Sequence, residues 1–184
     1  MGILNPNTAE MRVLFTHGKY ELREIGVGDA PEIFKRLTSR LRVMKYLPIK
    51  VHTHVKETEK MIVKWLRYEE NGIYVHVIQS KAEKRLVGII TAGRLDHSIA
   101  ISIQIVPDRH SMGAACVLGP AIAHNLLAHS EIWRLWAYSD VDNVPTINML
   151  HNMGCKCEGL MRRYEVHPNI SDEPRDCLLW SITR

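Results

Sequence analysis

The chain has 184 residues, of which 46% are hydrophobic and 24% charged, and its formal net charge is +4. This length suits one domain with a sizeable core, and the composition is that of an ordinary globular protein. The mild positive charge permits an anionic ligand, but no basic stripe indicates a nucleic-acid partner. No apolar run reaches membrane-spanning length and no signal-peptide core is present, so we expect no membrane segment.

We predict a single domain over residues 1–184, with residues 1–10 forming a loose polar arm. Residues 19–25 have the pattern of a strand. Asp29, with Glu32 three residues later, is typical of a helix start. The buried face of that helix is expected at regularly spaced apolar positions, namely Ile33, Phe34, Leu37 and Leu41.

A second helix is expected to begin with Thr53 as its cap and to end at residues 71–72, where an Asn-Gly pair occurs. Three strands then follow, at 73–79, 86–94 and 99–106. Short polar turns separate them, which predicts an antiparallel meander.

The third of these strands carries isoleucine at every second position, which is typical of a strand with one buried face. It ends at Pro107-Asp108, and a short polar segment leads into small residues and an apolar helix over about 114–129. Small residues at a helix start let an anion approach bare backbone N–H groups, and the helix dipole favours such an anion. This loop therefore predicts a phosphate-binding site.

The remaining elements are a strand at 134–141, a short helix at 144–152, and two strands at 155–166 and 175–183. Residues 167–174 are expected to form the long loop of a final hairpin. The complete order predicts an α/β protein with a sheet of mixed strand direction and helices on its faces.

None of the four cysteines belongs to a C-x-x-C pair, so we expect reduced thiols in a cytoplasmic protein. Cys155 and Cys157 would share one side of a strand, which leaves a chance metal site open. The ten histidines form neither H-x-x-x-H nor H-E-x-x-H, and we predict no metal.

This order of elements resembles the GNAT acyltransferase superfamily, and more narrowly its branch of ribosomal-protein alanine N-acetyltransferases. The motifs that carry the resemblance extend from about Tyr20 to Ile182: Leu22-Arg23, Asp29-Ala30, Ile33-Phe34, Val87-Gly88, Pro107 to Ala115, Asn143-x-x-Thr146, Leu150, Gly154, Glu158-Gly159, Arg162, Arg175-Asp176 and Leu178-Leu179-Trp180. The resemblance implies the GNAT fold, a mixed and mostly antiparallel central sheet of about seven strands flanked by about four helices and splayed at the cofactor groove.

The resemblance further implies an acyl-CoA-dependent N-acetyltransferase that moves the acetyl group of acetyl-CoA to a primary amine by direct attack in a ternary complex. The implied cofactor-binding residues lie on the isoleucine strand, the loop and the start of the short helix: Gln104, Ile105, Val106, Arg109, His110, Ser111, Met112, Gly113, Ala114, Ala115, Asn143 and Thr146. Backbone N–H groups from about Ser111 to Ala115 would hold the pyrophosphate. An amide of the 104–106 strand edge would face the thioester carbonyl.

Two residues are implied as catalytic. Thr146 falls where the branch often has serine, and its hydroxyl can donate a hydrogen bond to the departing sulfur. Asn143 can contact the pantetheine arm, although capping of the short helix explains an asparagine there equally well.

Several positions depart from the family pattern. His110 stands where the loop usually begins with Gln or Arg, and Ser111 where the branch often has a further glycine. Pro120 lies inside the expected cofactor helix, where it is expected to cause a kink. Ala100 lies where the branch commonly carries a glutamate, which leaves the general base without an assignment. By residue type the candidates for that base are Asp96, His97, His124 and His151. A relay of water molecules that removes the proton is an equal alternative.

The acceptor is expected to be a peptide or protein N-terminus or a small amine. Its selectivity should arise from the first two helices, the loop at 47–54 and the 167–174 loop. These segments carry polar side chains that could line the acceptor entrance: Tyr46, Lys50, His52, His54, Asp172 and Glu173. The sequence leaves homodimer formation open.

Two other readings compete with an enzyme. One is a non-catalytic acyl-CoA-binding module with the same fold, which the missing glutamate, the unusual loop and Pro120 permit. The other is a protein-interaction module whose cofactor groove is filled by side chains.

Overall fold

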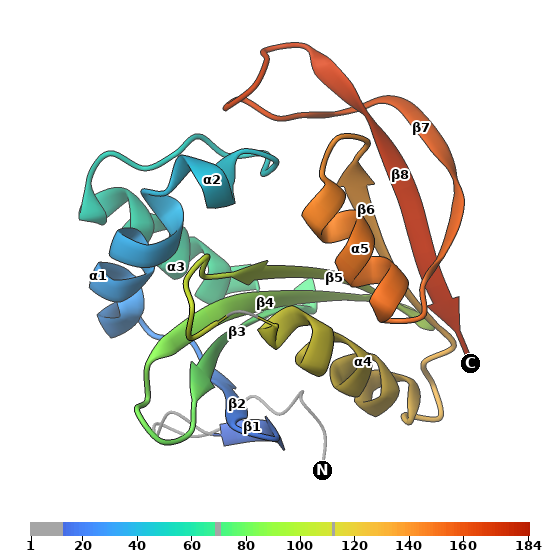
Figure 1. Ribbon diagram of the computed structural model, residues 1–184, viewed down its shortest axis with the longest axis horizontal. Helices are drawn as coiled ribbons and strands as arrows, with labels where there is room; N and C mark the ends of the chain where they lie inside the picture. The colour runs from blue at the N-terminus through green and yellow to red at the C-terminus, as the bar shows by residue number, and fades with distance from the viewer. Residues whose placement is uncertain (1–12, 69–70, 112) are drawn as a thin grey trace.

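A computed structural model describes residues 13–68, 71–111 and 113–184 (Figure 1). The expected arm at 1–10 lies outside these residues. The helices and strands of the described residues are, in chain order, β1 (Val13–His17), β2 (Tyr20–Glu24), α1 (Ala30–Ile33), α2 (Leu41–Met44), α3 (Val55–Tyr68), β3 (Ile73–Ser80), β4 (Leu86–Leu95), β5 (Ser98–Ile105), α4 (Ala114–Leu127), β6 (Arg134–Asp140), α5 (Val144–Asn152), β7 (Lys156–Val166) and β8 (Pro174–Thr183). A 3-10 turn at Val27–Asp29 and a π-helical turn at Phe34–Thr38 complete the N-terminal helical segment.

The strands form one sheet in the order β1-β2-β3-β4-β5-β6-β8-β7. All neighbouring pairs are antiparallel except β5 and β6, which are parallel. The predicted mixed α/β sheet, its meander and its final hairpin are therefore confirmed. The sheet has eight strands, one more than expected, because β1 pairs with β2 just before the first predicted strand.

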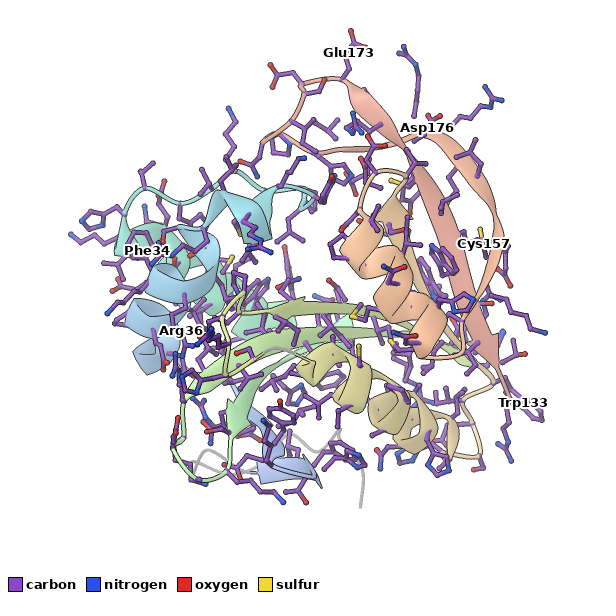
Figure 2. The ribbon with its side chains drawn as sticks, in the orientation of Figure 1. Phe34, Arg36, Trp133, Cys157, Glu173 and Asp176 are labelled. Atoms are coloured by element: carbon purple, nitrogen blue, oxygen red, sulfur yellow. The ribbon has the colours of Figure 1, made fainter. Side chains whose placement is uncertain are left out.

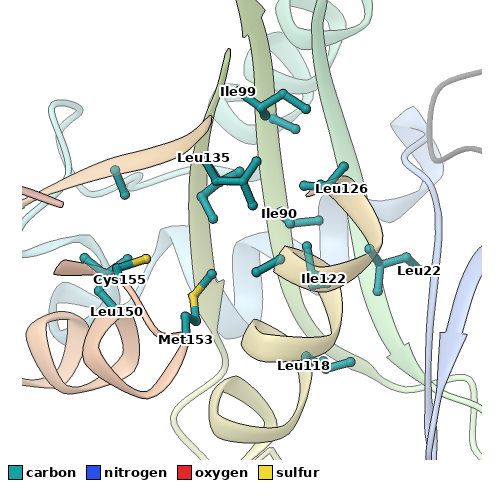
Figure 3. Packing of buried hydrophobic residues seen from close by; sticks show 14 of the residues in the cluster. Leu22, Ile90, Ile99, Leu118, Ile122, Leu126, Leu135, Leu150, Met153 and Cys155 are labelled. Carbon is teal, nitrogen blue, oxygen red and sulfur yellow. The ribbon is translucent and has the colours of Figure 1, made fainter. Parts of the chain in front are cut away.

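Two apolar cores lie on opposite faces of the sheet, and neighbouring residues of β4 show the division. Ile90 packs with the α4 residues Leu118, Ile122 and Leu126, as Figure 3 shows, whereas Ile89 belongs to the cluster that includes residues of α1 and α3. This alternation follows from the two-residue period of a strand. In Figure 1, α4 and α5 lie beside β5 and β6, and α1 to α3 gather near the N-terminal part of the sheet.

The first predicted helix differs from the expectation, because it breaks into short pieces. After the π-helical turn the backbone leaves helical geometry at Arg40, and a new turn begins at Leu41. Leu41 is consequently 56% exposed rather than buried. Thr38 is buried at the break, where its hydroxyl bonds to that of Thr58 on α3 at 2.7 Å, and this tertiary contact overrides the apolar period.

The two predicted helix caps differ in outcome. Asp29 stands at the N-cap position of α1, as predicted, but its carboxylate binds the Arg23 guanidinium and accepts the Gly26 N–H and makes no capping bond to α1. Thr53 lies one residue too early, since α3 begins at Val55 and His54 Nδ1 accepts the Lys56 N–H at 3.1 Å.

The parallel pair β5–β6 is joined over only three residue pairs. Ser98, Ile99 and Ala100 of β5 match Arg134, Leu135 and Trp136 of β6. Beyond Ala100 the two strands part, while β5 stays paired to β4 as far as Ile105. The predicted splay is present, and it leaves the second half of β5 with one open edge.

Candidate active site

A cavity of about 1080 Å³ occupies the space where β5 and β6 part. It extends from the loop before α4, past the start of α5, to the segment 42–49 and the end of β6. A groove of this size contradicts the reading in which side chains fill it. The cavity is large enough for a sizeable organic ligand.

Hydrogen bonds on one side of β5 determine which amides face this cavity. The Val106 N–H donates to the Val87 carbonyl of the neighbouring strand at 2.8 Å, so it is not available to a ligand. Because bonding directions alternate along an antiparallel pair, the N–H groups of Ile103 and Ile105 point to the open edge. Of the predicted segment Gln104 to Val106, only the Ile105 N–H is therefore open to a ligand in the cavity, and the Ile103 N–H is the next open one along β5.

The loop before α4 differs from the expected row of convergent amides. The Ser111 N–H donates to Asp108 Oδ1 at 2.9 Å, and the Ala114 N–H donates to the Ser111 carbonyl at 3.0 Å. Within the part of the chain that the structure describes, no backbone partner is found for the N–H groups of Gly113 and Ala115, and both residues line the cavity. Met112, the remaining predicted member, lies outside the described residues.

Gly113 has a backbone conformation that favours glycine. Its φ is +77°, and a Cβ at this position would meet nothing within 4 Å. The site is therefore open in front of the α4 N-terminus, where the helix dipole favours an anion. Gly113 precedes the first residue of α4, which continues through Pro120 to Leu127.

Asp108 holds this loop in place through three partners. Arg36 and Arg85 form ion pairs with Asp108 Oδ2, and Oδ1 accepts the Ser111 N–H. Partial burial opposes ionisation, but the Ser111 N–H and the Arg36 guanidinium outweigh it and lower the pKa of Asp108 to about 2. Its negative charge is thus balanced within the protein and does not repel an anion at Gly113.

The two predicted cationic side chains of the loop differ in position. Arg109 and His110 are both exposed, but only Arg109 lines the cavity. Of this pair, Arg109 is therefore the side chain that can add positive charge at the cavity.

Asn143 and Thr146 lie at the start of α5 and both line the cavity. Asn143 Oδ1 accepts the Thr146 N–H at 3.4 Å, so this asparagine is the helix cap that the sequence offered as one alternative. A cap of this kind uses the amide oxygen and leaves the amide nitrogen for another contact. The structure thus brings both predicted catalytic residues to the groove opposite β5.

The four base candidates lie away from the cavity. Asp96 and His97 form the turn between β4 and β5, at the end of the sheet where β5 and β6 are still paired. His124 and His151 are exposed on α4 and α5. None of the four lines the cavity.

A buried acid–histidine pair that the sequence did not single out does line it. His167 follows β7 directly and Asp140 ends β6, and each is 1% exposed. His167 Nε2 lies 3.4 Å from Asp140 Oδ2, and Arg175 Nε donates to the same oxygen at 2.6 Å. The sequence signal was a polar residue at the end of each strand, but only the fold shows that the two ends meet.

The expected acceptor segments form the far wall of the cavity. Tyr46 and residues 47–49 line it there, and we call this part of the lining the acceptor wall. Asn169 ties the wall to the β7–β8 connection, because its Nδ2 donates to the carbonyls of Met44 and Ile49 at 2.8 Å and its Oδ1 accepts the Val51 N–H at 2.9 Å.

Other expected acceptor residues lie elsewhere. Lys50, His52, His54, Asp172 and Glu173 do not line the cavity. Glu173 is at the outer tip of the β7–β8 connection in Figure 2, where it pairs with Arg163 at 3.7 Å. Of the six expected entrance residues only Tyr46 therefore lines the cavity, and the cations Arg42 and Lys45 lie in its lining beside it.

All four cysteines are free thiols, of which Cys155 and Cys177 are buried. Among the described residues no group of three or more His, Cys, Asp or Glu side chains is arranged to hold a metal ion. Within the same residues, no helix combines the length and apolar character that crossing a membrane requires.

A family model described as an acetyltransferase (GNAT) domain matches residues 19–156. A search of curated protein sequences finds no match.

Three similar solved structures illustrate the likeness in fold. Spermidine N-acetyltransferase from Vibrio cholerae, solved with CoA and spermine, has a TM-score of 0.74 at 19% identity, covering 90% of this chain and 95% of that one.

RimJ from Mycobacterium smegmatis, solved with CoA-disulfide, has a TM-score of 0.74 at 24% identity and covers 89% of this chain and 81% of that one. Ribosomal-protein-S5-alanine acetyltransferase from Vibrio fischeri has a TM-score of 0.72 at 17% identity, covering 92% and 95%. At such identities the likeness concerns the fold, and the names of two of these enzymes give different acceptors, spermidine and an alanine of ribosomal protein S5.

Proposed function

The chain belongs to the GNAT acetyltransferase family, and from this premise we propose that it is an acetyl-CoA-dependent N-acetyltransferase for a primary amine. The acceptor is a peptide or protein N-terminus or a small amine, as in the ribosomal-protein branch and the spermidine enzyme among its structural relatives. The observation that carries this proposal is the open edge of β5, which faces Thr146 across a cavity that begins at Gly113. A cytoplasmic location stays a prediction.

The residues of the groove fit acetyl-CoA in three places. The open space before Gly113 and the α4 N-terminus suit the pyrophosphate, with Arg109 supplying further positive charge. The parted edge of β5 offers backbone groups to the pantetheine arm. The Ile105 N–H would donate to the thioester carbonyl oxygen, where one such donor stabilises a developing oxyanion by about 3 kcal/mol.

The chemistry that acetyl-CoA supplies when bound is an acetyl thioester. The protein contributes alignment of the acceptor nitrogen with the carbonyl carbon and a hydrogen bond to the leaving sulfur. We assign that hydrogen bond to the Thr146 hydroxyl, which lies in the first turn of α5, and contact with the arm to the amide nitrogen of Asn143. Direct attack in a ternary complex requires no covalent enzyme intermediate.

Release of CoA with a panel of amines tests this proposal. The panel contains peptides with different free N-termini, the same peptides with blocked N-termini, and spermidine, and products are identified by mass. Transfer of an acetyl group to an amine supports the proposal. Failure to bind acetyl-CoA in calorimetry contradicts it.

A second candidate is a non-catalytic acyl-CoA-binding module. It is favoured by Ala100 in place of a carboxylate and by the loop amides of Ser111 and Ala114, which already have partners. Micromolar or tighter binding of acetyl-CoA without transfer to any amine of the panel would select this candidate over the enzyme.

A further inference from the structure

The cluster of His167 and Asp140 has no part in the chemistry assigned above, yet it is buried in the wall of the same cavity. His167 is 1% exposed, and its Nδ1 is a buried nitrogen for which the described residues offer no hydrogen-bond partner. Buried polar nitrogens are nearly always bonded, so an unpartnered one beside a cavity calls for a polar group supplied from the cavity. The cluster lies at the acceptor end, since Tyr46 of the acceptor wall contacts the His167 ring edge-on at a centroid distance of 6.3 Å.

Asp140 determines which nitrogen of His167 carries the proton. Its Oδ2 lies 3.4 Å from His167 Nε2, and on this ground we assign the proton of the neutral ring to Nε2, which leaves the lone pair on Nδ1. Asp140 is itself fixed by Arg175, whose Nε and Nη2 donate to its two oxygens at 2.6 and 3.2 Å. The ring is thus held in the tautomer that can accept a proton at Nδ1.

Burial favours the neutral form of His167 in the resting protein, and the charged groups around the ring act in both directions. Burial is the largest influence and lowers its pKa below 6.5, and Arg175 of β8 acts in the same direction. Asp140 of β6 and Glu165 of β7 oppose this shift. Cys177 of β8, whose Sγ lies 3.9 Å from Nε2, has a pKa raised to about 11 and is therefore an uncharged thiol.

Resting on the proposed acetyltransferase function, we propose that His167 is the general base of this enzyme, that Asp140 is its positioning residue, and that the acceptor is an α-amine of a peptide or amino acid. In the reaction the acceptor ammonium gives one proton to His167 Nδ1. The freed nitrogen lone pair then forms the C–N bond with the acetyl carbonyl carbon, and the C–S bond breaks. The second proton passes from nitrogen to the leaving thiolate, and His167 returns its proton to water.

The acceptor class follows from matching the base to the amine. An α-amine has a pKa of about 7.7–8.0, whereas a lysine-type amine has about 10.4. Every unit by which the pKa of the amine exceeds that of the base reduces the transferred fraction about tenfold. A buried neutral imidazole is therefore matched to an α-amine and poorly matched to lysine or a polyamine.

The first test needs only the unmodified protein and two peptides, one with a free N-terminus and no lysine, the other with a blocked N-terminus and one lysine. We expect kcat/KM for the α-amine peptide to rise with pH only up to a pKa below 6.5, and the lysine peptide to react about 100-fold more slowly at pH 7. A rate that follows the free-amine fraction up to the pKa of the peptide overturns the inference but leaves the proposed function intact. Equal rates on the two peptides overturn the acceptor class. Binding of acetyl-CoA without product on either peptide overturns the proposed function, and this inference with it.

The second test separates the base from a structural role by using two isosteric variants. In His167→Gln the amide reaches the Nε2 position and keeps the contact with Asp140, while in His167→Asn it occupies the Nδ1 position but cannot take a proton. We expect both variants to lose about 100-fold in kcat at pH 6.5, the low end of what general bases contribute, and the loss to shrink about tenfold for each pH unit towards the acceptor pKa. His151→Gln, on the exposed face of α5, is the matched control.

A loss that is equal at every pH, or a fully active His167→Asn variant, would overturn the assignment. Thermal melting and acetyl-CoA affinity are measured on the same samples, so that a folding defect is recognised. If either variant fails to fold, the pH profile of the unmodified protein still decides.

Discussion

Arg36 of the π-helical turn pairs with Asp108 in the loop before α4, a contact between residues 72 positions apart. Figure 2 shows Arg36 beside this loop. Arg85 reaches the same Asp108 oxygen at 2.9 Å, so the N-terminal helical segment, the β3–β4 turn and the loop are tied at one carboxylate. This tie places the open amide of Gly113 at the end of the groove.

Replacement of Asp108 by Asn should lower the free energy of unfolding at pH 7 by about 1–3 kcal/mol, because it removes the charged partner of two guanidinium groups. The pKa of Asp108 is about 2 in the fold against 3.8 ordinarily. Its contribution is therefore complete above pH 4 and is lost as the pH falls towards 2. Denaturant unfolding at several pH values checks this, with exposed Lys35→Met as control. An undiminished difference at pH 3 or below would contradict it.

Replacement of Gly113 by Glu should weaken acetyl-CoA binding at least about 100-fold, since the carboxylate occupies the open space and repels the pyrophosphate. The positive φ adds a strain of about 1–2 kcal/mol. Gly18 is the matched control, because its φ is +55° and a Cβ there also meets nothing within 4 Å. Gly18→Glu should show similar strain with unchanged affinity in calorimetry. Equal affinities for the two variants would count against the placement of the pyrophosphate.

Thr146→Val removes the hydroxyl and keeps the shape of the side chain. We expect kcat to fall by about tenfold or more, because one hydrogen bond to the leaving sulfur is lost, while acetyl-CoA affinity changes less than threefold. Thr146→Ser should restore most of the rate. Steady-state kinetics at saturating acetyl-CoA measure this, and an unchanged kcat in the Val variant would move the proton donor elsewhere.

Asn169→Ala should loosen the acceptor wall. It removes the bonds to Met44, Ile49 and Val51, which join the wall to the β7–β8 connection. We expect the KM for the acceptor to rise about tenfold with acetyl-CoA affinity unchanged, because the cofactor side of the cavity is untouched. Asn148→Ala on the exposed side of α5 is the control. A rise in the KM for acetyl-CoA alone would refute this division of the cavity.

His76 on β3 makes stability depend on pH. It is 4% exposed, and burial lowers its pKa from 6.5 to about 4. Between these values the unfolded chain binds the proton and the folded chain does not, so stability falls as the pH drops from 6.5 to 4, by about 3 kcal/mol. In His76→Gln this slope should flatten, whereas in the exposed His97→Gln it should persist. Unfolding curves between pH 7 and 4 decide, and the same slope in His76→Gln would be inconsistent with this origin.

The sequence predicted the sheet well because the spacing of apolar residues, every second position in a strand and every third or fourth in a helix, indicates which side of each element is buried. The isoleucine strand, its meander partners and the final hairpin were all identified in this way. The family resemblance supplied the splay between β5 and β6, which no local pattern contains. The N-terminal helix was misjudged because the bond between Thr38 and Thr58, a contact across 20 residues, decides where it breaks.

The site could be predicted only as far as local chemistry and the family resemblance reach. Gly113 was found because small residues precede a helix there, and Asn143 and Thr146 because the family resemblance covers them; all three line the cavity. The loop amides of Ser111 and Ala114 were misassigned because their partners, Asp108 and the Ser111 carbonyl, depend on the folded loop. The pair of Asp140 and His167 was missed because two strand ends 27 residues apart meet only in the folded sheet.

The most direct test of the proposed site is a crystal structure with acetyl-CoA. We predict that the pyrophosphate lies against Gly113 and Ala115, and that the thioester carbonyl oxygen accepts the Ile105 N–H within hydrogen-bond distance. Acetyl-CoA bound away from the gap between β5 and β6, or strands that pair along their whole length and close this gap, would contradict the proposed site.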